Sequence, residues 1–382
     1  MPATKPRTSR TSSRSRAKGG THAIQKGRLA GVRRGMRRHG LDALLITNPV
    51  DIRYLTGFSG EASYALVTRT QFWVISDFRF QEELAALGGL ARVFIRTGEI
   101  VGALGEVAGG MGLGAIGFQS EHLAYSTATR IAKLLGVKNM VPTSGVLSDL
   151  RQVKDESELK SIRAAVKIQE DALVATLGQI DAGMTELEVT AILEYEMKAR
   201  GSTDPAFGSI VAAGANGSLP HAIPGKAKLK RNSTLLIDWG ATVNGYRSDM
   251  TRTFALGKWP TVMREVYEVV LEAHYAGIEA IRPGAIAGKV DAAARKIIDD
   301  AGYGKEFGHS LGHGIGLNVH EAPGLRAGAD TVLEPGMVVT VEPGIYLPGV
   351  GGVRIEDDVL VTARGARSLC SLPKDIRWAT LT

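Results

Sequence analysis

The C-terminal part of the chain contains an internal duplication, which constrains the fold more than any other feature of the sequence. Residues 180–201 (IDAGMTELEVTAILEYEMKARG) align without a gap with residues 281–302 (IRPGAIAGKVDAAARKIIDDAG), at a constant offset of 101 positions. Both segments have the apolar periodicity of an amphipathic helix, which by itself makes some matches between them expected. The segments that follow each helix therefore decide whether the duplication is real.

Four further features follow both helical segments in the same order. They are a Phe-Gly step (207–208 and 307–308), a His-x-x-Pro motif (221–224 and 320–323), an apolar strand leading to acid-x-Gly (234–240 and 338–344) and an Arg-x-acid triplet (247–249 and 354–356). A unit of this length is far too long for a solenoid repeat. We therefore predict two related half-domains that face each other across a pseudo-two-fold axis.

A different pattern precedes the duplication. Residues 29–150 alternate helical and strand signals: RLAGVRRGMRRHG predicts a helix that ends at Gly40, ALLIT and FWVISD predict strands, and FRFQEELAAL predicts a second helix. The segment NPVDIRYLTGFSG between them is expected to be a loop. This alternation predicts an α/β domain over 29–150. A second domain over 151–382 then begins with a long amphipathic helix opened by Asp155 and Glu156.

The basic charge of the chain is concentrated at its N-terminus. The net charge is +7, but residues 1–28 hold eight Lys or Arg and no acidic residue, which leaves −1 for the other residues. This Ser/Thr/Arg-rich segment is predicted to be a disordered, solvated tail. It lacks the apolar stretch of a secretory signal, and we expect no more than nonspecific phosphate contacts from it.

Cysteine content and hydropathy point to a cytoplasmic protein. Cys370 is the single cysteine of the sequence, which excludes an internal disulfide and suits a reducing compartment. No apolar run approaches the length of a membrane span.

The duplication brings acidic and histidine side chains together. Each half supplies two carboxylates and a histidine, and the second half adds two more histidines: Asp238, Asp249 and His221, then Glu342, Glu356 and His320, with His309 and His313. Four carboxylates in one cleft cannot all stay ionised without cations. Two divalent ions would neutralise them, and an oxygen-rich set favours manganese, cobalt or iron over a thiolate-type zinc site. Such a pair can share carboxylates and a water.

Each of these residues also has a purely structural interpretation. An acid at a strand end is commonly a turn residue or a helix cap. Asp249 and Glu356 have the alternative of surface ion pairs with Arg247 and Arg354, and a lone histidine is usually structural. The repetition of acid, spacing and histidine in both halves favours the joint site.

Four motifs of the second domain resemble those of the pita-bread metallopeptidases, in the branch of the Xaa-Pro peptidases. They are IDWGATVNGYRSDMTRTF, HSLGHGIGLNVHEAPG, VVTVEPGIYLPG and GGVRIEDDVLV. The resemblance implies an α+β architecture: a C-terminal pita-bread (creatinase/aminopeptidase) fold with pseudo-two-fold symmetry, preceded by a smaller creatinase-like α/β domain. It covers the chain from about residue 30 to the end and leaves only the basic tail outside.

The resemblance also implies a role for each residue. Asp238 would bind one metal, His313 and Glu342 the other, and Asp249 and Glu356 would bridge the two, while His221, His309 and His320 would lie on the substrate side and Arg354 beside the bridging glutamate. The glycines of the histidine segment would let the backbone pass close to the metals. Mn²⁺ is the expected metal, with Co²⁺, Fe²⁺ or Zn²⁺ as alternatives.

The implied activity is hydrolysis of the peptide bond that precedes proline. This bond has no N–H, so recognition cannot depend on one. One metal with His320 or His221 would stabilise the oxyanion, and Glu342 would carry a proton from water to the proline nitrogen. We favour release of an N-terminal residue (Xaa-Pro aminopeptidase), with the dipeptidase (prolidase) as the alternative, because both share these motifs.

Other interpretations remain open at this point. Methionine aminopeptidases resemble the ligand set but usually lack the N-terminal domain, and creatinase is similar without the metal carboxylates. A nucleic-acid or histone-binding module would instead use residues 1–28, and would lose salt-dependent binding when they are deleted. The family resemblance also predicts a homodimer, with NPVDIRYLTGFSG contributing across its interface, and a proline-containing peptide as the substrate.

Overall fold

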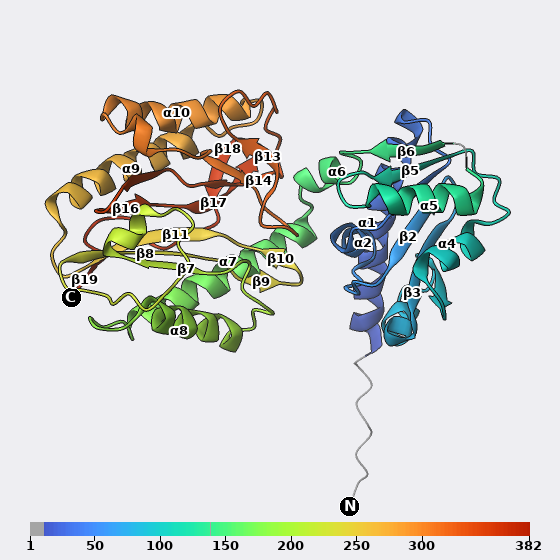
Figure 1. The fold of residues 1–382 in the computed structure, drawn as a ribbon, viewed down its shortest axis with the longest axis horizontal. Coiled ribbons are helices and arrows are strands. Elements are labelled where there is room, and N and C mark those ends of the chain that lie inside the picture. The colour runs from blue at the N-terminus through green and yellow to red at the C-terminus, as the bar shows by residue number, and fades with distance from the viewer. Residues whose placement is uncertain (1–10, 138) are drawn as a thin grey trace, which may run out of the picture. The chain divides into compact units, whose positions relative to one another are not determined.

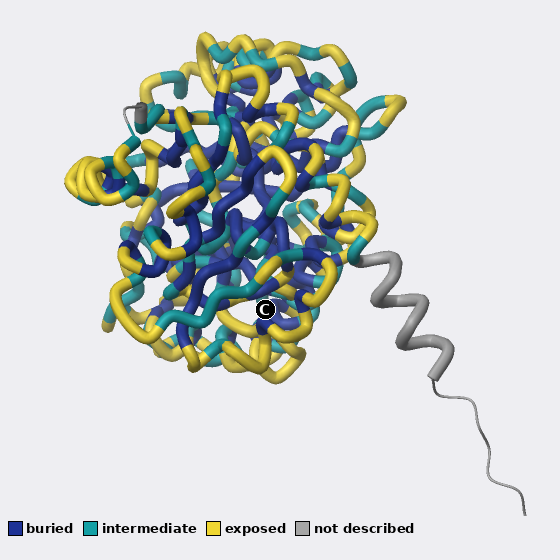
Figure 2. Tube along the Cα trace, turned by 90° about the vertical axis from the view of Figure 1, so that its right-hand side faces the viewer, coloured by how far each residue is buried: buried dark blue, intermediate teal, exposed yellow. Residues whose placement is uncertain are grey.

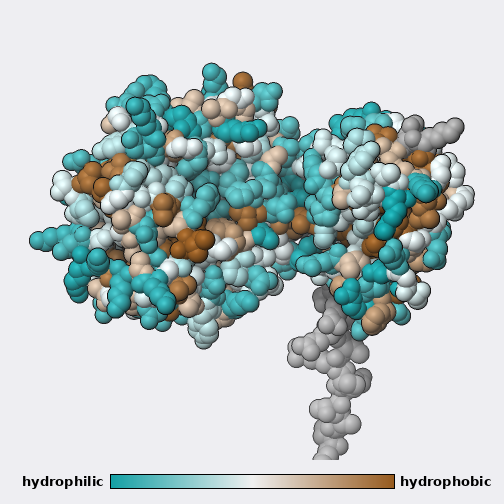
Figure 3. Space-filling view, in the orientation of Figure 1, coloured by the Kyte–Doolittle hydropathy of each residue, from teal (hydrophilic) through white to brown (hydrophobic). Residues whose placement is uncertain are grey.

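The computed structural model describes residues 11–137 and 139–382. The chain divides into two compact units, Met1–Leu150 and Arg151–Thr382, called unit 1 and unit 2 below (Figure 1). Within the described residues, no helix is both long and apolar enough to cross a bilayer. The face drawn in Figure 3 is mostly hydrophilic, with apolar side chains in separate small patches.

Unit 1 is an α/β domain, as predicted, built on a six-stranded mixed sheet of order β4-β3-β2-β1-β5-β6. The strands are β1 (Ala43–Ile46), β2 (Tyr64–Thr68), β3 (Phe72–Asp77), β4 (Arg92–Arg96), β5 (Ala115–Gln119) and β6 (Asn139–Thr143). The helices are α1 (Thr11–Arg38), α2 (Pro49–Thr56), α3 (Gln81–Ala85), α4 (Ile100–Ala108), α5 (Tyr125–Leu135) and α6 (Ser148–Gln152), with a 3-10 turn η1 (Phe78–Phe80). Leu104 and Ile131, from α4 and α5, pack with Ile116 of β5 in its core.

The predicted disorder of residues 1–28 is wrong for the end of that segment, because α1 already includes it. The Gln25 amide is buried and its Nε2 donates to the Thr56 carbonyl at 2.6 Å. Arg28 Nη1 donates to the Tyr54 carbonyl at 2.6 Å. The polar composition of the segment gave no sign of these contacts, because both side chains donate to backbone carbonyls of α2. Residues 1–10 lie outside the described residues.

The segment NPVDIRYLTGFSG is not a simple loop, since most of it forms helix α2. Asn48 caps this helix, with its side-chain oxygen accepting from the Val50 N–H at 3.0 Å. Pro49 occupies the first helical position, where a missing N–H has no effect. Gly57 ends the helix in the left-handed conformation, with φ of 78°. The sequence contained these start and stop signals, and the loop prediction gave them too little weight.

Unit 2 contains two main sheets. The first has the order β19-β11-β8-β7 and the second β13-β12-β14-β17-β18. The strands of the first are β7 (Ile210–Ala213), β8 (Ser233–Trp239), β11 (Met250–Leu256) and β19 (Thr380–Leu381); those of the second are β12 (Gly312–Gly314), β13 (Glu321–Leu325), β14 (Val338–Val341), β17 (Asp357–Thr362) and β18 (Gly365–Ser368). Two hairpins accompany them, formed by β9 (Thr242–Val243) with β10 (Tyr246–Arg247) and by β15 (Gly344–Leu347) with β16 (Gly351–Arg354).

Two helix pairs cover the outer sides of these strands (Figure 1). They are α7 (Glu156–Leu177) with α8 (Glu186–Ala199), and α9 (Thr261–Ala280) with α10 (Ala287–Asp300); the 3-10 turns are η2 (Gly214–Ser218) and η3 (Gly304–Glu306). Asp155 caps α7 in a capping box with Glu158, as the acidic helix start predicted. Over the described chain as a whole, Figure 2 shows buried segments in the interior and exposed segments at the periphery.

The predicted duplication is present as two halves of the same plan. The order α7-α8-β7-β8-β11 is repeated as α9-α10-β12-β14-β17, and α8 and α10 keep the offset of 101 residues at both ends. A backbone hydrogen bond joins the halves at the centre, from the Glu356 N–H to the Thr251 carbonyl at 3.1 Å. The pita-bread fold with pseudo-two-fold symmetry is therefore confirmed, and the central strands of the two halves meet.

Candidate metal centre

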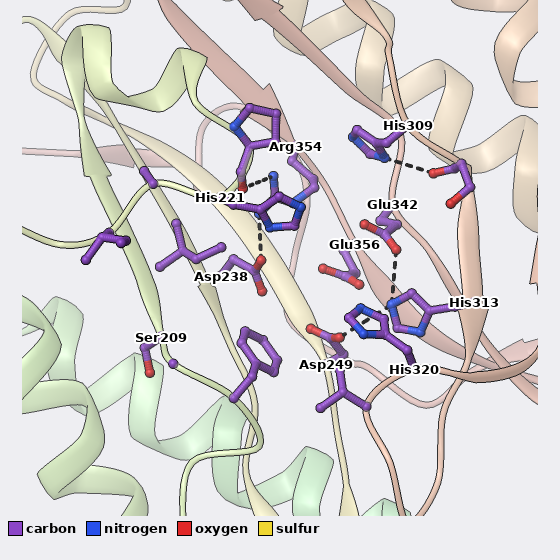
Figure 4. Close-up of a pocket in the computed structure, with 18 of the residues that line it drawn as sticks. Ser209, His221, Asp238, Asp249, His309, His313, His320, Glu342, Arg354 and Glu356 are labelled. Carbon is purple, nitrogen blue, oxygen red and sulfur yellow. Dashed lines mark hydrogen bonds and ion pairs between the residues drawn. The ribbon is translucent and has the colours of Figure 1, made fainter. Parts of the chain in front are cut away.

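All nine side chains predicted for the site line one cavity of about 540 Å³ in unit 2 (Figure 4). They are His221, Asp238, Asp249, His309, His313, His320, Glu342, Arg354 and Glu356. The first three come from the first half of the duplication and the other six from the second. The cavity therefore needs both halves, as the repeated motifs indicated.

Strand ends bring the four carboxylates together. Asp238 lies near the end of β8 and Asp249 just before β11, while Glu342 follows β14 and Glu356 precedes β17. In both halves these two strands pair antiparallel. The end of one strand then lies beside the start of the next, so each half delivers two acids to one edge, and the central hydrogen bond sets the two edges against each other.

Three of these side chains already have the spacing of a metal site. One ligand atom from each of Asp249, His313 and Glu356 lies within 4.8 Å of the others. His313 Nε2 is 3.8 Å from Asp249 Oδ2 and 3.3 Å from Glu342 Oε1. His313 Nδ1 lies 3.1 Å from the Gly314 carbonyl, which can only accept. The ring proton therefore sits on Nδ1, and the Nε2 lone pair faces the acids.

Burial makes this cluster unable to hold its full negative charge alone. It raises the pKa of Asp249 and Glu356 well above the usual carboxyl range, and neighbouring carboxylates raise both further. Burial, and then the Asp238 charge, raise the pKa of Glu342 to about 8, against the opposing effect of Arg354. Among the described residues, the buried Oδ1 of Asp238 has no hydrogen-bond partner. Acids that are costly to ionise and an unpaired buried oxygen fit divalent cations.

Three side chains that the sequence did not single out hold the ligands in place. Thr251 Oγ1 donates to Glu356 Oε2 at 2.6 Å, and Thr340 Oγ1 donates to Glu342 Oε1 at 3.1 Å. Asp358 Oδ2 accepts from the Asp249 backbone N–H at 3.0 Å. Each lies two residues from a predicted ligand, which places it on the same side of an extended chain. That spacing was the available signal, although such residues are ordinary in strands.

Arg354 is part of a buried chain of polar contacts, and the surface-pair alternative is wrong. Its Nη2 binds Asp238 Oδ2 at 2.6 Å, and its side chain is 4% exposed. Its Nη1 donates to Tyr346 Oη at 2.7 Å, and that hydroxyl lies 2.9 Å from His309 Nε2. Arg354 reaches Glu356 only through Thr251, whose Oγ1 accepts from Arg354 Nε at 3.0 Å. Tyr346 was missed because a tyrosine in GIYL reads as a strand residue.

The other triplet arginine, Arg247, also makes no surface pair with Asp249. Its Nη1 instead donates to the Ala206 carbonyl. Burial lowers its pKa, so the guanidinium is partly withdrawn from water. In both Arg-x-acid triplets the acid thus lines the cavity, and the arginine binds a group other than that acid.

The histidines surround the ligands (Figure 4). The rings of His313 and His320 meet edge to face, with centroids 4.3 Å apart. Burial lowers the pKa of His309 and of His313 to about 4. Both are therefore neutral near pH 7, as ligation or hydrogen-bond acceptance requires.

The glycines around His313 leave room for neighbouring backbone. A Cβ on Gly312 would lie 2.0 Å from the Thr340 carbonyl oxygen, and one on Gly314 would lie 2.3 Å from the Ala322 carbonyl oxygen. They therefore permit close approach of the neighbouring strands β14 and β13. The segment between His309 and Gly324 is accordingly partly strand.

The cavity is also lined by apolar residues. They are Phe207, Ile210, Ala222, Ile223, Pro224 and Val319. The cavity thus combines a group of acids and histidines with a surface suited to an apolar portion of a ligand.

Comparisons with known proteins agree with this architecture. Residues 160–363 match the model of metallopeptidase family M24, and residues 28–153 match that of the creatinase/prolidase N-terminal domain. The Xaa-Pro dipeptidase of Pyrococcus horikoshii is 36% identical over 343 residues, which cover 89% of this chain and 96% of that protein.

Solved structures resemble the whole described fold. The Xaa-Pro dipeptidase from Bacillus anthracis is 38% identical with a TM-score of 0.89, covering 92% of this chain and 99% of that one. The X-Pro aminopeptidase from Thermotoga maritima is 36% identical with a TM-score of 0.83, covering 90% and 99%. Fold and site together define a metallopeptidase of the pita-bread type. The chain belongs to metallopeptidase family M24 and carries the creatinase-type N-terminal domain.

Proposed function

We propose that this chain hydrolyses Xaa-Pro peptide bonds, and that its preferred substrate is the Xaa-Pro dipeptide. The sequence alone favoured the aminopeptidase, and we now favour its alternative, the Xaa-Pro dipeptidase. Two of the three relatives described above carry the name Xaa-Pro dipeptidase, including the structure from Bacillus anthracis, which has a higher identity and TM-score than the third, an X-Pro aminopeptidase. The aminopeptidase remains the second candidate on the strength of that third structure.

The observation that carries the proposal is the cavity itself. It combines the acid and histidine cluster with six apolar residues within about 540 Å³. A prolyl residue is apolar and its peptide nitrogen carries no hydrogen, so apolar side chains can hold the ring where no N–H is available for recognition.

The family resemblance indicates which side chains would hold two divalent ions, and the close grouping of Asp249, His313 and Glu356 supports this set. Asp238 would bind one ion and His313 with Glu342 the other, while Asp249 and Glu356 would be shared. When bound, such ions polarise a peptide carbonyl and lower the pKa of a water molecule. We propose Mn²⁺ as the first choice, with Co²⁺, Fe²⁺ and Zn²⁺ to be compared with it. A homodimer and a cytoplasmic location also remain predictions.

The chain's own residues would then move the protons and hold the substrate. Glu342 takes the proton released by the attacking water and passes it to the proline nitrogen, which must be protonated to leave as an amine. His320 or His221 donates to the carbonyl oxygen as negative charge develops on it. Arg354 holds the Asp238 carboxylate in orientation through their 2.6 Å contact.

Product analysis tests the proposal. Full-length protein loaded with Mn²⁺ is incubated with an Xaa-Pro dipeptide and with the Xaa-Pro-Yaa tripeptide that extends it, and an Xaa-Ala dipeptide serves as control. We expect cleavage of the Xaa-Pro dipeptide at a higher kcat/KM than of the other two. A tripeptide cleaved as well as the dipeptide would favour the aminopeptidase, and cleavage of neither would contradict the Xaa-Pro assignment.

A further inference from the structure

Three of the four histidines that line the cavity lie on loops, and each of these loops is attached to a buried carboxylate outside the cavity. We infer that Glu186, Asp291 and Glu321 are positioning residues for His221, His309 and His320, respectively. The inference rests on the proposed function only for the substrate used in its kinetic test. The contacts of each carboxylate carry the argument.

Glu186 attaches the loop of His221. It is the first residue of α8 and is 1% exposed. Its Oε1 accepts from the Ala213 N–H and the Asn216 amide, both at 2.8 Å, and its Oε2 accepts from the Gly225 N–H at 2.9 Å. These donors lie on both sides of His221 in the chain, so one side chain closes the loop that presents the ring.

Asp291 attaches the loop of His309 in the other half. It lies on α10, the counterpart of α8, and is also 1% exposed. Asp291 Oδ1 accepts from the Leu311 N–H at 3.0 Å. It also binds Arg295, whose Nη1 and Nη2 donate to the carbonyls of Phe307 and His309 at 3.0 and 2.9 Å. Equivalent helices of the two halves, α8 and α10, thus each hold a histidine loop through a buried carboxylate, although the carboxylates are not at corresponding positions.

Glu321 attaches the loop of His320, its neighbour in sequence. Its Oε1 accepts from the Asn318 N–H at 2.8 Å and from Arg151 Nη2. Its Oε2 lies 3.5 Å from Lys154 Nζ. The side chains of Arg151, Lys154 and Glu321 are all 6% exposed or less. The histidine loop is therefore held by the first residues of unit 2, far from it in sequence.

Burial of these charges argues for a role beyond stability. Buried ion pairs are commonly replaceable by apolar residues without loss of stability. A carboxylate that accepts several N–H bonds does, however, fix the loop that provides them. Among the described residues, the rings of His221 and His320 make no hydrogen bond of their own to protein. Their positions depend on their loops, and so on Glu186 and Glu321.

Double-mutant cycles test the inference on the full-length, metal-loaded protein with the Xaa-Pro dipeptide. Glu186→Asp and Glu321→Asp keep the charge but shorten the attachment by one methylene. A loop shift of roughly 1 Å should lower kcat/KM about 10-fold or more. In the matched background, Glu186→Asp with His221→Ala or Glu321→Asp with His320→Ala, we expect less than about a twofold further loss. In the crossed backgrounds the full loss should remain.

Equal losses in matched and crossed backgrounds would overturn the inference, because a general effect on folding does not depend on which histidine is present. Circular dichroism and metal content identify variants that fold. If Glu186→Asp or Glu321→Asp does not fold, Asp291→Asn combined with His309→Ala supplies a third double-mutant cycle. Wild-type protein that cleaves no Xaa-Pro peptide would contradict the proposed function instead.

A second measurement needs no activity. In protein labelled with ¹⁵N-histidine, Glu321→Asp should shift the imidazole resonances of His320 and leave those of His221 unchanged, and Glu186→Asp should do the reverse. The His→Ala variants assign the resonances. Unchanged resonances for both histidines in both variants would also overturn the inference.

Discussion

At the scale of single residues, the main feature of the candidate metal centre is that its carboxyl groups are buried and therefore costly to ionise. Asp249 and Glu356 are buried, and their pKa values lie well above the usual range because burial and neighbouring carboxylates disfavour ionisation. Thr251 supplies one hydrogen bond to Glu356, which an amide oxygen could also accept. The cluster is therefore arranged for a positively charged ligand rather than for the stability of the protein without one.

The first prediction concerns Glu356→Gln. This change keeps the size and the Thr251 contact of the side chain but removes its charge. We expect it to lower bound metal below that of the wild type and to reduce kcat/KM at least about 100-fold. The metal-free variant should melt at or above the wild-type temperature, since a like charge has been removed. Metal analysis, kinetics and calorimetry in EDTA check this; retained turnover would show that Glu356 is not a shared ligand.

A second prediction concerns the pH dependence of stability. Burial lowers the pKa of His274 to about 3, with Asp357 opposing the shift and Lys374 and Arg252 adding to it. Since the folded pKa is below the ordinary value of about 6.5, only the unfolded chain takes up the proton between these values. The contribution of neutral His274 to the free energy of unfolding is therefore complete above pH 6.5. It is lost as pH falls toward 3, by at most about 1.4 kcal/mol per pH unit.

Urea unfolding of metal-free protein at pH 7 and pH 5.5 measures this effect. His274→Leu should lose less stability over this interval than the wild type, by about 1 kcal/mol. His39→Leu, which changes an exposed histidine of unit 1, serves as the control and should behave like the wild type. Equal losses in wild type and His274→Leu would contradict the assignment.

At the scale of elements, the central strands connect the two halves reciprocally. Thr251 lies two residues after Asp249 and bonds Glu356 of the other half. Asp358 lies two residues after Glu356 and accepts from the Asp249 N–H. Corresponding positions of β11 and β17 thus reach across the pseudo-two-fold axis, and each half orients a carboxylate of the other.

The third prediction follows from that exchange. Thr251→Val keeps the shape of the side chain but removes the donor to Glu356 and the acceptor for Arg354 Nε. Metal affinity and kcat/KM should each fall about 10- to 100-fold. Thr251→Ser should restore both, because the hydroxyl returns. Calorimetric titration with Mn²⁺ and steady-state kinetics measure the two effects; a silent Thr251→Val variant would contradict the proposed orientation of Glu356.

The elements also show how far sequence reasoning reached. The duplication predicted the four carboxylates with His221 and His320, because it repeats acids and a histidine in the same order in both halves. The histidine-rich segment added His309 and His313, and the family resemblance added Arg354. Thr340 and Tyr346 escaped it, since their residue types are common in strands and their partners become visible only in space. Helix α2 was missed although its caps were legible, because a proline next to a turn-forming residue equally suits a loop. The end of the tail was missed because Gln25 binds backbone rather than apolar groups.

At the scale of the whole molecule, the candidate metal site lies entirely within unit 2. Every residue of the cavity lies in Arg151–Thr382, and unit 1 has its own sheet and core. The fold class was predictable from sequence because the α/β alternation ends where the duplication begins. The contacts that position the histidines were not, since Arg151 and Glu321 are widely separated in the chain and only folding makes them neighbours.

The fourth prediction uses this confinement. A ligand that binds only the folded state stabilises the unit that holds it, by about 2.7 kcal/mol at a free concentration 100 times its Kd. Calorimetry of the full-length protein should therefore show one transition that moves upward with added Mn²⁺ and returns after EDTA, and another that does not move. In Glu356→Gln, whose metal binding is weakened, the upward shift should be smaller. A single transition that shifts with Mn²⁺ would mean that the units unfold as one body, and no shift in the wild type would contradict a metal centre in unit 2.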